Sequence, residues 1–414
     1  MTTGFSQQTV ERIASGDPAW LKTQRRAAWQ AFEKLPMPGR RDLEWQHFDL
    51  RPLQLDQISI GNGDGPAIAE TLTPLPADLA RQGVIFCDLA TAIARHGDRV
   101  GSYLGRTAAA EEPLKFAALH AACWNAGAFL YVPRNVRVGI PLEVAYEFRG
   151  RQAAGFPHTL VVIEPGAEAT LVQKFTGGPP AGNDGAPSLP ASGTDVFVEE
   201  SGRLHYISLQ NFQPGVFDFT VKRAHVVRDA EIDWVLGMFG GSFLRYDVQC
   251  AMDGPGGRSF LYGVGVGDRG QQFGQFTRQH HRTGHTVSDL LFKNVLSDAA
   301  VSSYAGIIKV EKDANGTNAY QANRNLVLGD KVRCHTKPIL EIESNQLRCT
   351  HGATVGRPDE NQIFYLRSRG LTAGQARDVL VEAFLEPVLA RIRVPEVCQE
   401  FRNLIHRKAV EHRP

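Results

Sequence analysis

The feature that most constrains the fold is a long region, residues 131–355, in which short β-rich runs alternate with tight turns of small or polar residues. Leu204–Leu209 and Ile232–Leu236 are two such runs, and Arg228-Asp229-Ala230 is a turn between them. Several turns lie about thirty residues apart, a spacing typical of the coils of a solenoid rather than of a closed barrel. No fixed motif marks the repeat, so a β-sandwich is the alternative that periodicity leaves open. Residues 176–195 are rich in glycine and proline, and we predict that they form a flexible insertion in the β-region.

Helical signals flank this region on both sides. Residues 1–130 are predicted to form a mostly helical N-terminal domain, and residues 356–414 a C-terminal helical domain. In the latter, Thr372 and Gln375 form a capping box that precedes an apolar stripe at helical spacing. Pro387 has no amide proton to donate, so we expect it to kink or restart the helix. The chain is therefore predicted to be mainly β, with helices at both ends.

Composition excludes several classes of protein. The 414 residues include 45 basic and 44 acidic side chains, a net charge of +1, which gives no electrostatic reason to expect binding to nucleic acid or to an anionic membrane. No apolar stretch approaches the roughly 18 residues of a membrane span, and the first residues do not resemble a secretory signal. We therefore expect a cytoplasmic protein. The six cysteines are scattered without a C-x-x-C pair, which argues against a self-contained zinc or iron–sulfur site.

The motifs of common enzyme classes are missing from the sequence. It contains no phosphate-binding loop, no nucleophile elbow and no H-E-x-x-H helix, so we predict that the chain is not an enzyme. A histidine group, formed by His280, His281 and His285, would hold a metal only if three imidazoles converged. The alternative, which we favour, is a β-turn whose imidazoles form hydrogen bonds with neighbouring coils.

A second candidate metal site is the triplet Cys349-Thr350-His351. In a strand, residues i and i+2 point to the same face with Cα atoms about 7 Å apart, so the thiol and the imidazole would project together. This pair suits iron or zinc, but two ligands do not complete a coordination sphere. The remaining ligands would come from elsewhere in the fold or from another protein. The alternative is a buried cysteine beside a histidine that only satisfies a backbone carbonyl.

Several motifs in the C-terminal third, dense over residues 286–392, carry a resemblance to a known family. They are Ser288–Leu296 (SDLLFKNVL), Ala319–Leu326 (AYQANRNL), Lys337–Ile342 (KPILEI), Cys349–Gly356 (CTHGATVG) and Ile363–Gly370 (IFYLRSRG). In this order and spacing they resemble the SufB/SufD family of iron–sulfur cluster assembly proteins. The triplet Cys-Thr-His is similar to that of SufD-type members, whereas SufB-type members carry Cys-Glu-His.

The resemblance implies a right-handed parallel β-helix flanked by helical domains. It also implies a non-catalytic subunit of the Suf complex, which pairs with a SufB-like scaffold through the β-helix and with a SufC-like ATPase through the C-terminal helical domain. In the family, the cysteine and histidine of the C-x-H motif contribute to cluster formation near the interface of the two β-helix subunits. Carried over to this chain, these are Cys349 and His351, so the pair would be half of a metal site at the partner interface.

The resemblance further implies that the chain holds no cofactor stably by itself, and that iron or an iron–sulfur cluster is present only transiently at the partner interface. Some complexes of the family associate with a reduced flavin, but no residue here predicts this. From their place around the C-terminal helices, we expect six residues to contact a partner: Tyr365, Arg367, Arg369, Ala376, Leu380 and Phe384.

Two other functions are kept as alternatives. One is a SufB-like scaffold that binds a cluster in its own right. The other is a polysaccharide lyase or hydrolase, because parallel β-helices often carry such activities. A lyase or hydrolase would need carboxylates clustered on one face of the solenoid, and here the acidic residues are dispersed.

Overall fold

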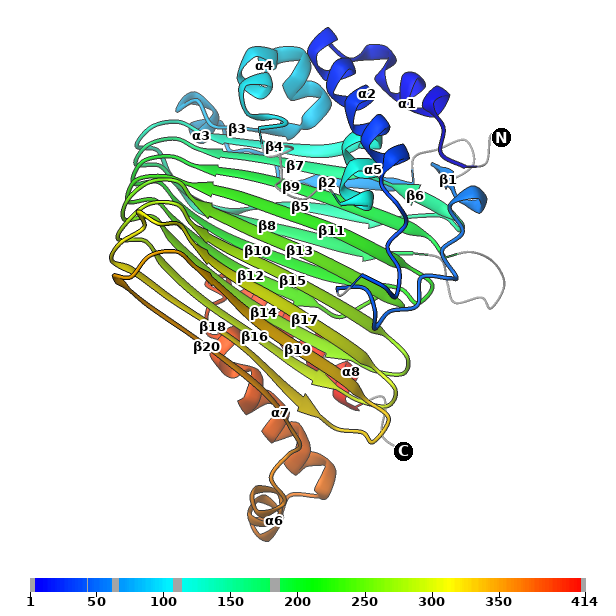
Figure 1. Ribbon diagram of the computed structural model, residues 1–414, viewed down its shortest axis with the longest axis vertical. Helices are drawn as coiled ribbons and strands as arrows, with labels where there is room; N and C mark the ends of the chain where they lie inside the picture. Colours follow the sequence, from blue (N-terminus) through cyan, green and yellow to red (C-terminus); the bar gives the residue numbers. More distant parts are fainter. Residues whose placement is uncertain (1–3, 43, 62–66, 107–113, 179–186, 411–414) are drawn as a thin grey trace.

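The computed structural model describes residues 4–42, 44–61, 67–106, 114–178 and 187–410. Its centre is a β-solenoid built from two long sheets that face each other, with helices packed at both chain ends (Figure 1). Consecutive strands of the solenoid alternate between the two sheets, and each strand pairs in parallel with the strand two positions further along the chain. This parallel pairing excludes the β-sandwich and confirms the predicted mainly β solenoid with helices at both ends.

The first sheet contains β3 (Ile85–Asp88), β4 (Ala126–Val132), β7 (Pro157–Ile163), β9 (Leu189–Val198), β11 (Phe217–Val226), β13 (Phe243–Met252), β15 (Gln272–His281), β17 (Val301–Val310) and β19 (Arg333–Ile342), with β1 (Ser59–Ile60) and β6 (Ala153–Gly155) at its side. The second sheet contains β2 (Ile68–Leu72), β5 (Arg137–Phe148), β8 (Glu168–Gly177), β10 (Arg203–Phe212), β12 (Glu231–Met238), β14 (Arg258–Gly267), β16 (Val287–Leu296), β18 (Thr317–Val327) and β20 (Leu347–Gly356). The short strands β2 and β3 pair antiparallel with the first coil.

The register explains the loose repeat of the sequence. Arg203 pairs with Glu231 and Arg258 pairs with Val287, so equivalent residues lie 28 and 29 positions apart. Asp229, in one of the predicted turns, adopts a left-handed backbone with φ of 53°, a conformation that aspartate tolerates better than most residues. Spacing and turn chemistry together predicted the coils correctly although no motif repeats.

Equivalent side chains on successive coils stack inside the solenoid and form its core. Tyr206, Trp234, Leu261 and Leu290 are register partners on four consecutive strands of the second sheet, and each is fully buried. Burying each such side chain stabilises the fold by about 1.5–3 kcal/mol. The core is therefore a continuous column of stacked side chains. It is shielded from water at its two ends only if other elements or a partner cover them.

The N-terminal helices pack on the outer face of the first sheet (Figure 1). They are α1 (Gln7–Ile13), α2 (Ala19–Lys34), α3 (Ala77–Arg81), α4 (Leu89–Tyr103) and α5 (Lys115–Cys123), with the 3₁₀ turns η1 (Ala14–Gly16) and η2 (Leu55–Gln57). An aromatic cluster joins them to the sheet: Phe116 of α5 stacks on Phe219 of β11 with ring centroids 3.7 Å apart. Residues 4–130 thus contribute strands β1 to β4 as well as helices.

The C-terminal helices are α6 (Glu360–Ser368), α7 (Ala373–Leu389) and α8 (Pro395–Val410). Helices α7 and α8 pack on the second sheet, on the side of the solenoid opposite to the N-terminal helices. Phe401 of α8 is fully buried there and meets Phe239 edge to face, with ring centroids 5.6 Å apart. Gly237 leaves the room for this ring, because a Cβ at that position would lie 2.5 Å from Phe401 Cε1.

The capping box of Thr372 and Gln375 is confirmed at the start of α7, but two predictions need correction. Helix α7 continues through Pro387 and ends at Leu389; the proline lies in the last turn, so few backbone hydrogen bonds are lost. The predicted flexible insertion 176–195 is wrong at Thr176 and Gly177, which end β8, and from residue 189 onward, where β9 is buried along its whole length. Gly193 in β9 has no side chain, which lets His120 of α5 approach the strand closely. Residues 179–186 of the predicted insertion lie outside the described residues.

In the described part of the chain, the structure contains no helix with the length and apolar character needed to cross a bilayer.

Candidate metal half-site at the open end of the solenoid

The last coil of the solenoid, formed by β19 and β20, has no coil beyond it. Each of these strands is the final one in its sheet and pairs on one side only. The inward-facing side chains of this coil are partly or fully exposed, whereas their register partners one coil earlier are buried. We call this surface the open end; it comprises Leu340, Ile342, Leu347, Cys349, His351 and Val355. Ile342 is 41% exposed and Val355 51% exposed, so the core of the solenoid ends in an uncovered apolar surface.

Cys349 and His351 occupy interior positions of this last coil. Cys349 is the register partner of Ala319, and His351 is the partner of Gln321, and both partners are buried inside the solenoid. Gln321 Nε2 donates a hydrogen bond to the carbonyl of Gly306 in the opposite sheet, which fixes its direction toward the interior. Cys349 and His351 therefore share one face of β20, as the sequence predicted. They lie at the end of the sheet, where no further described strand pairs with β20.

The two side chains differ in their surroundings. Cys349 is half-buried against a small apolar cluster that includes Ile308 and Val310, and this burial raises the pKa of its thiol. The thiol is therefore protonated at neutral pH and must lose its proton before it binds a metal. His351 is exposed. Among the described residues no group of three or more histidine, cysteine, aspartate or glutamate side chains has the geometry of a metal site.

A second cysteine lies on the interior side of the last coil. Cys334 of β19 pairs in register with the buried Ser302, and burial raises the pKa of its thiol to about 12. The next residue, His335, points to the outer side and stacks on His47 with ring centroids 3.5 Å apart. The two neighbours thus face opposite sides of the strand and do not form a ligand pair.

The histidine group of residues 280–285 is built into the coil structure. His280 Nε2 lies 2.6 Å from a carboxylate oxygen of Glu311. The ring nitrogens of His281 lie 2.8 and 2.9 Å from the hydroxyls of Thr286 and Ser288, and burial lowers its pKa to about 3. Hydrogen bonds with neighbouring groups thus occupy the imidazoles of His280 and His281.

The predicted partner-binding residues around the C-terminal helices separate into two groups. Tyr365, Arg367 and Arg369 are exposed, and the guanidinium of Arg369 lies 5.3 Å from the ring of Tyr365. The sequence analysis did not select Phe364, which is the most exposed large apolar side chain of the described residues at 72%. Phe364 lies before the apolar stripe that follows Thr372, and its position next to Tyr365 is the feature of the sequence that could have identified it as a contact residue.

The other three residues belong to the packing of α7 on the solenoid. Ala376 is fully buried, so the prediction that it contacts a partner directly needs correction. Leu380 is half-buried. Phe384 packs against the core beneath α7, and Lys293 Nζ lies 4.6 Å from its ring centroid. The face of α7 that looked amphipathic in the sequence is thus partly used inside the molecule.

Comparisons with known proteins agree with the motifs. The family model "SUF system FeS cluster assembly, SufBD core domain" matches residues 146–384. A protein of Bacillus subtilis (strain 168) named "Iron-sulfur cluster assembly protein SufD" is 31% identical over 422 residues, which cover 95% of this chain and 94% of that protein. A Staphylococcus aureus (strain USA300) protein named as an iron-sulfur cluster assembly SufBD family protein is 24% identical over 435 residues, covering 97% and 92% of the two chains.

Proposed function

The chain belongs to the SufB/SufD family of iron–sulfur cluster assembly proteins, and on this premise we propose that it is a non-catalytic subunit of a Suf complex. In this role it pairs with a SufB-like subunit at the open end and with a SufC-like ATPase at the C-terminal helices. Iron or the nascent cluster is the cargo of the complex and not a resident cofactor of this chain. The observation that carries the proposal is the open end itself.

The open end supports pairing with a second β-solenoid. Its two edge strands have backbone groups free to form hydrogen bonds, and such edges pair readily with another strand. The side chains of Ile342 and Val355 would leave water on pairing. A second solenoid offers both a matching strand edge and an apolar core cross-section, which a smaller partner does not.

The same surface supports a shared metal site. Cys349 and His351 lie on the interior face of β20, within the area that a partner would cover. Covering them would exclude water, and the partner would supply the further ligands that a four-coordinate site requires. We propose that each subunit contributes part of the coordination sphere of the iron or cluster under assembly.

The C-terminal helices support docking of the ATPase. Phe364 and Tyr365 are exposed on α6 beside Arg367 and Arg369, and Val379 of α7 is 42% exposed. Exposed aromatic residues with neighbouring arginines are typical of the central residues of protein interfaces. Helix α6 protrudes from the molecule at the end opposite to the N-terminal helices, where a partner can reach it (Figure 1).

Co-expression of the chain with a SufB-like subunit and a SufC-like ATPase tests this function. We expect the three proteins to co-purify, and we expect replacement of Phe364 by alanine to release the ATPase while the SufB-like subunit stays bound. Met37, which is 42% exposed in the N-terminal part, provides the control, Met37→Ala. A chain that remains alone in the presence of both candidates would contradict the proposal. A stable coloured cluster on the single chain after anaerobic reconstitution would favour the SufB-like scaffold instead.

A further inference from the structure

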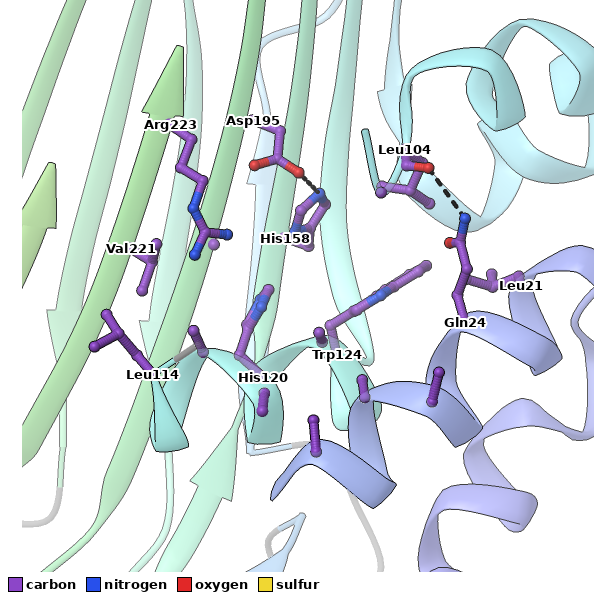
Figure 2. A pocket seen from close by; sticks show the side chains of 18 residues that line it. Leu21, Gln24, Leu104, Leu114, His120, Trp124, His158, Asp195, Val221 and Arg223 are labelled. Atoms are coloured by element: carbon purple, nitrogen blue, oxygen red, sulfur yellow. Dashed lines mark hydrogen bonds and ion pairs between the residues drawn. The ribbon is translucent and has the colours of Figure 1, made fainter. Parts of the chain in front are cut away.

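A cavity of about 330 Å³ lies between the N-terminal helices and the outer face of the first sheet (Figure 2). Helices α2 and α5 form its roof, and β7, β9 and β11 form its floor. The roof is lined by three alanines from each helix: Ala27, Ala28, Ala31, Ala117, Ala118 and Ala121. Its volume is at the lower end of the range for small-molecule sites, about 300–1,000 Å³, so it suits a compact molecule.

A glycine in the floor of the cavity allows helix α5 to pack close to the sheet. A Cβ at Gly193 of β9 would lie 2.3 Å from His120 Cε1 and 2.8 Å from His158 Nδ1. The absence of a side chain there lets both imidazoles come down onto the strand, with ring centroids 5.3 Å apart. On the helix side, Gln24 Nε2 donates a hydrogen bond to the carbonyl of Leu104, 3.3 Å away, and closes one wall.

The cavity is lined by a buried histidine whose ring nitrogens have no hydrogen-bond partner in the described part of the chain. His158 is 6% exposed, and neither of its ring nitrogens has a hydrogen-bond partner among the described residues. Its Nε2 lies 3.6 Å from Asp195 Oδ2, beyond hydrogen-bond distance. Burial, together with the nearby guanidiniums of Arg25 and Arg223, lowers the pKa of His158 to about 3, so this imidazole is neutral at physiological pH.

One basic and one acidic side chain complete the floor. Arg223 of β11 and Asp195 of β9 are register partners on neighbouring strands. Figure 2 shows the carboxylate of Asp195 directed toward His158. Arg223 Nε is buried without a hydrogen-bond partner among the described residues. Burying such a group without a partner is unfavourable, so a ligand that supplies the partner binds more tightly.

The chemistry of these groups restricts the ligand. A metal ion is disfavoured by the guanidinium, and the described histidines and carboxylates do not form a metal-binding group of three or more. A simple anion would meet Asp195 as well as Arg223, and a simple cation would meet Arg223 as well as Asp195. A molecule that carries an ammonium group and a carboxylate group on the same carbon satisfies the two side chains at once, and the alanines offer an apolar space for the rest of it.

We propose that this cavity binds a free α-amino acid with a small apolar side chain, its carboxylate on Arg223 and its ammonium group on Asp195 and the free nitrogen of His158. His120 contributes little to recognition, because its Nε2 already lies 3.1 Å from the carbonyl of Pro157. The side chain of the amino acid lies among the alanines of α2 and α5.

Isothermal titration calorimetry of the full chain with three probes tests the charge assignment. L-valine carries both charged groups, isovalerate lacks the ammonium group and isobutylamine lacks the carboxylate. We expect saturable 1:1 binding of L-valine, and at least tenfold weaker binding of the other two. No binding of L-valine, or binding of isovalerate or isobutylamine as tight as that of L-valine, would overturn the proposal.

Variants locate the binding. Arg223→Gln should weaken L-valine at least tenfold, and Asp195→Asn should weaken L-valine while leaving isovalerate unchanged or tighter. Arg228→Gln, in an exposed turn, is the matched control and should bind as the unaltered chain does. Because either floor variant can disturb folding, Ala118→Leu fills the cavity from the helix side without removing a polar group and should also abolish binding. Retained binding in both Arg223→Gln and Ala118→Leu would contradict this location.

Discussion

Removing the exposed apolar side chains of the open end should weaken pairing with a SufB-like subunit without unfolding the chain. Ile342 is the last residue of β19 and Val355 the penultimate residue of β20, and they are already 41% and 51% exposed. Their truncation to alanine therefore removes little from the core of the isolated chain. In the complex, a covering partner would bury the remaining area of both side chains.

The expected loss follows from these exposed fractions. Fully burying an isoleucine or valine side chain is worth about 1.5–3 kcal/mol, so burying these exposed fractions contributes about 1.4–2.8 kcal/mol in total. This corresponds to about a 10- to 100-fold increase in Kd for the double variant. Ile140 on β5 has the same exposed fraction, 41%, near the other end of the solenoid, so Ile140→Ala is the matched control.

Titration of the purified SufB-like subunit with each variant measures this change, and thermal unfolding of the isolated chains verifies that they remain folded. We expect unchanged affinity for Ile140→Ala and weaker affinity for the double variant. If both bind equally well, the open end is not the pairing surface. If both lose affinity equally, the effect does not come from this end of the solenoid.

Three further predictions concern the half-site, the ATPase surface and pH. His351→Ala should lower cluster formation, measured by iron and sulfide content, while the complex stays intact. Thr350→Ala, on the other face of β20, is the control and should form clusters normally. Equal iron and sulfide content in the two variants would reject the half-site. Phe364→Ala should weaken ATPase binding about tenfold or more, measured by calorimetry, because exposed aromatic anchors dominate interfaces. Burial raises the pKa of Glu70 to about 7, so the folded state holds a proton that the unfolded state loses above about pH 4.5, and stability falls as pH rises through 7. Glu70→Gln keeps an acceptor for the amide of Gly127, so its melting temperature should exceed that of the unaltered chain at pH 8 and match it near pH 4; an equal difference at both pH values would contradict this.

Local patterns were sufficient for the solenoid and for the face of the Cys-x-His pair. Turn residues such as Asp229 and the alternation of a strand act over a few positions, so they can be recognised in the sequence. They also sufficed for the capping box at Thr372, whose two reciprocal hydrogen bonds join residues three apart. For residues 189–195 the composition led to a wrong prediction, because the small residues there suggested a flexible insertion.

The sequence by itself determined the coil spacing and the pairing of Cys349 with His351 on one face, because turns and strand alternation depend on neighbours along the chain. Periodicity left a β-sandwich open, and the parallel β-helix was expected from the family resemblance. Only the tertiary structure decided which ends and faces stay uncovered. It buried Ala376, left Phe364 and Val355 exposed, and placed Gly193 beneath two histidines to form the alanine-lined cavity. Burial depends on contacts between residues far apart in sequence, and no local pattern records which of those contacts will form.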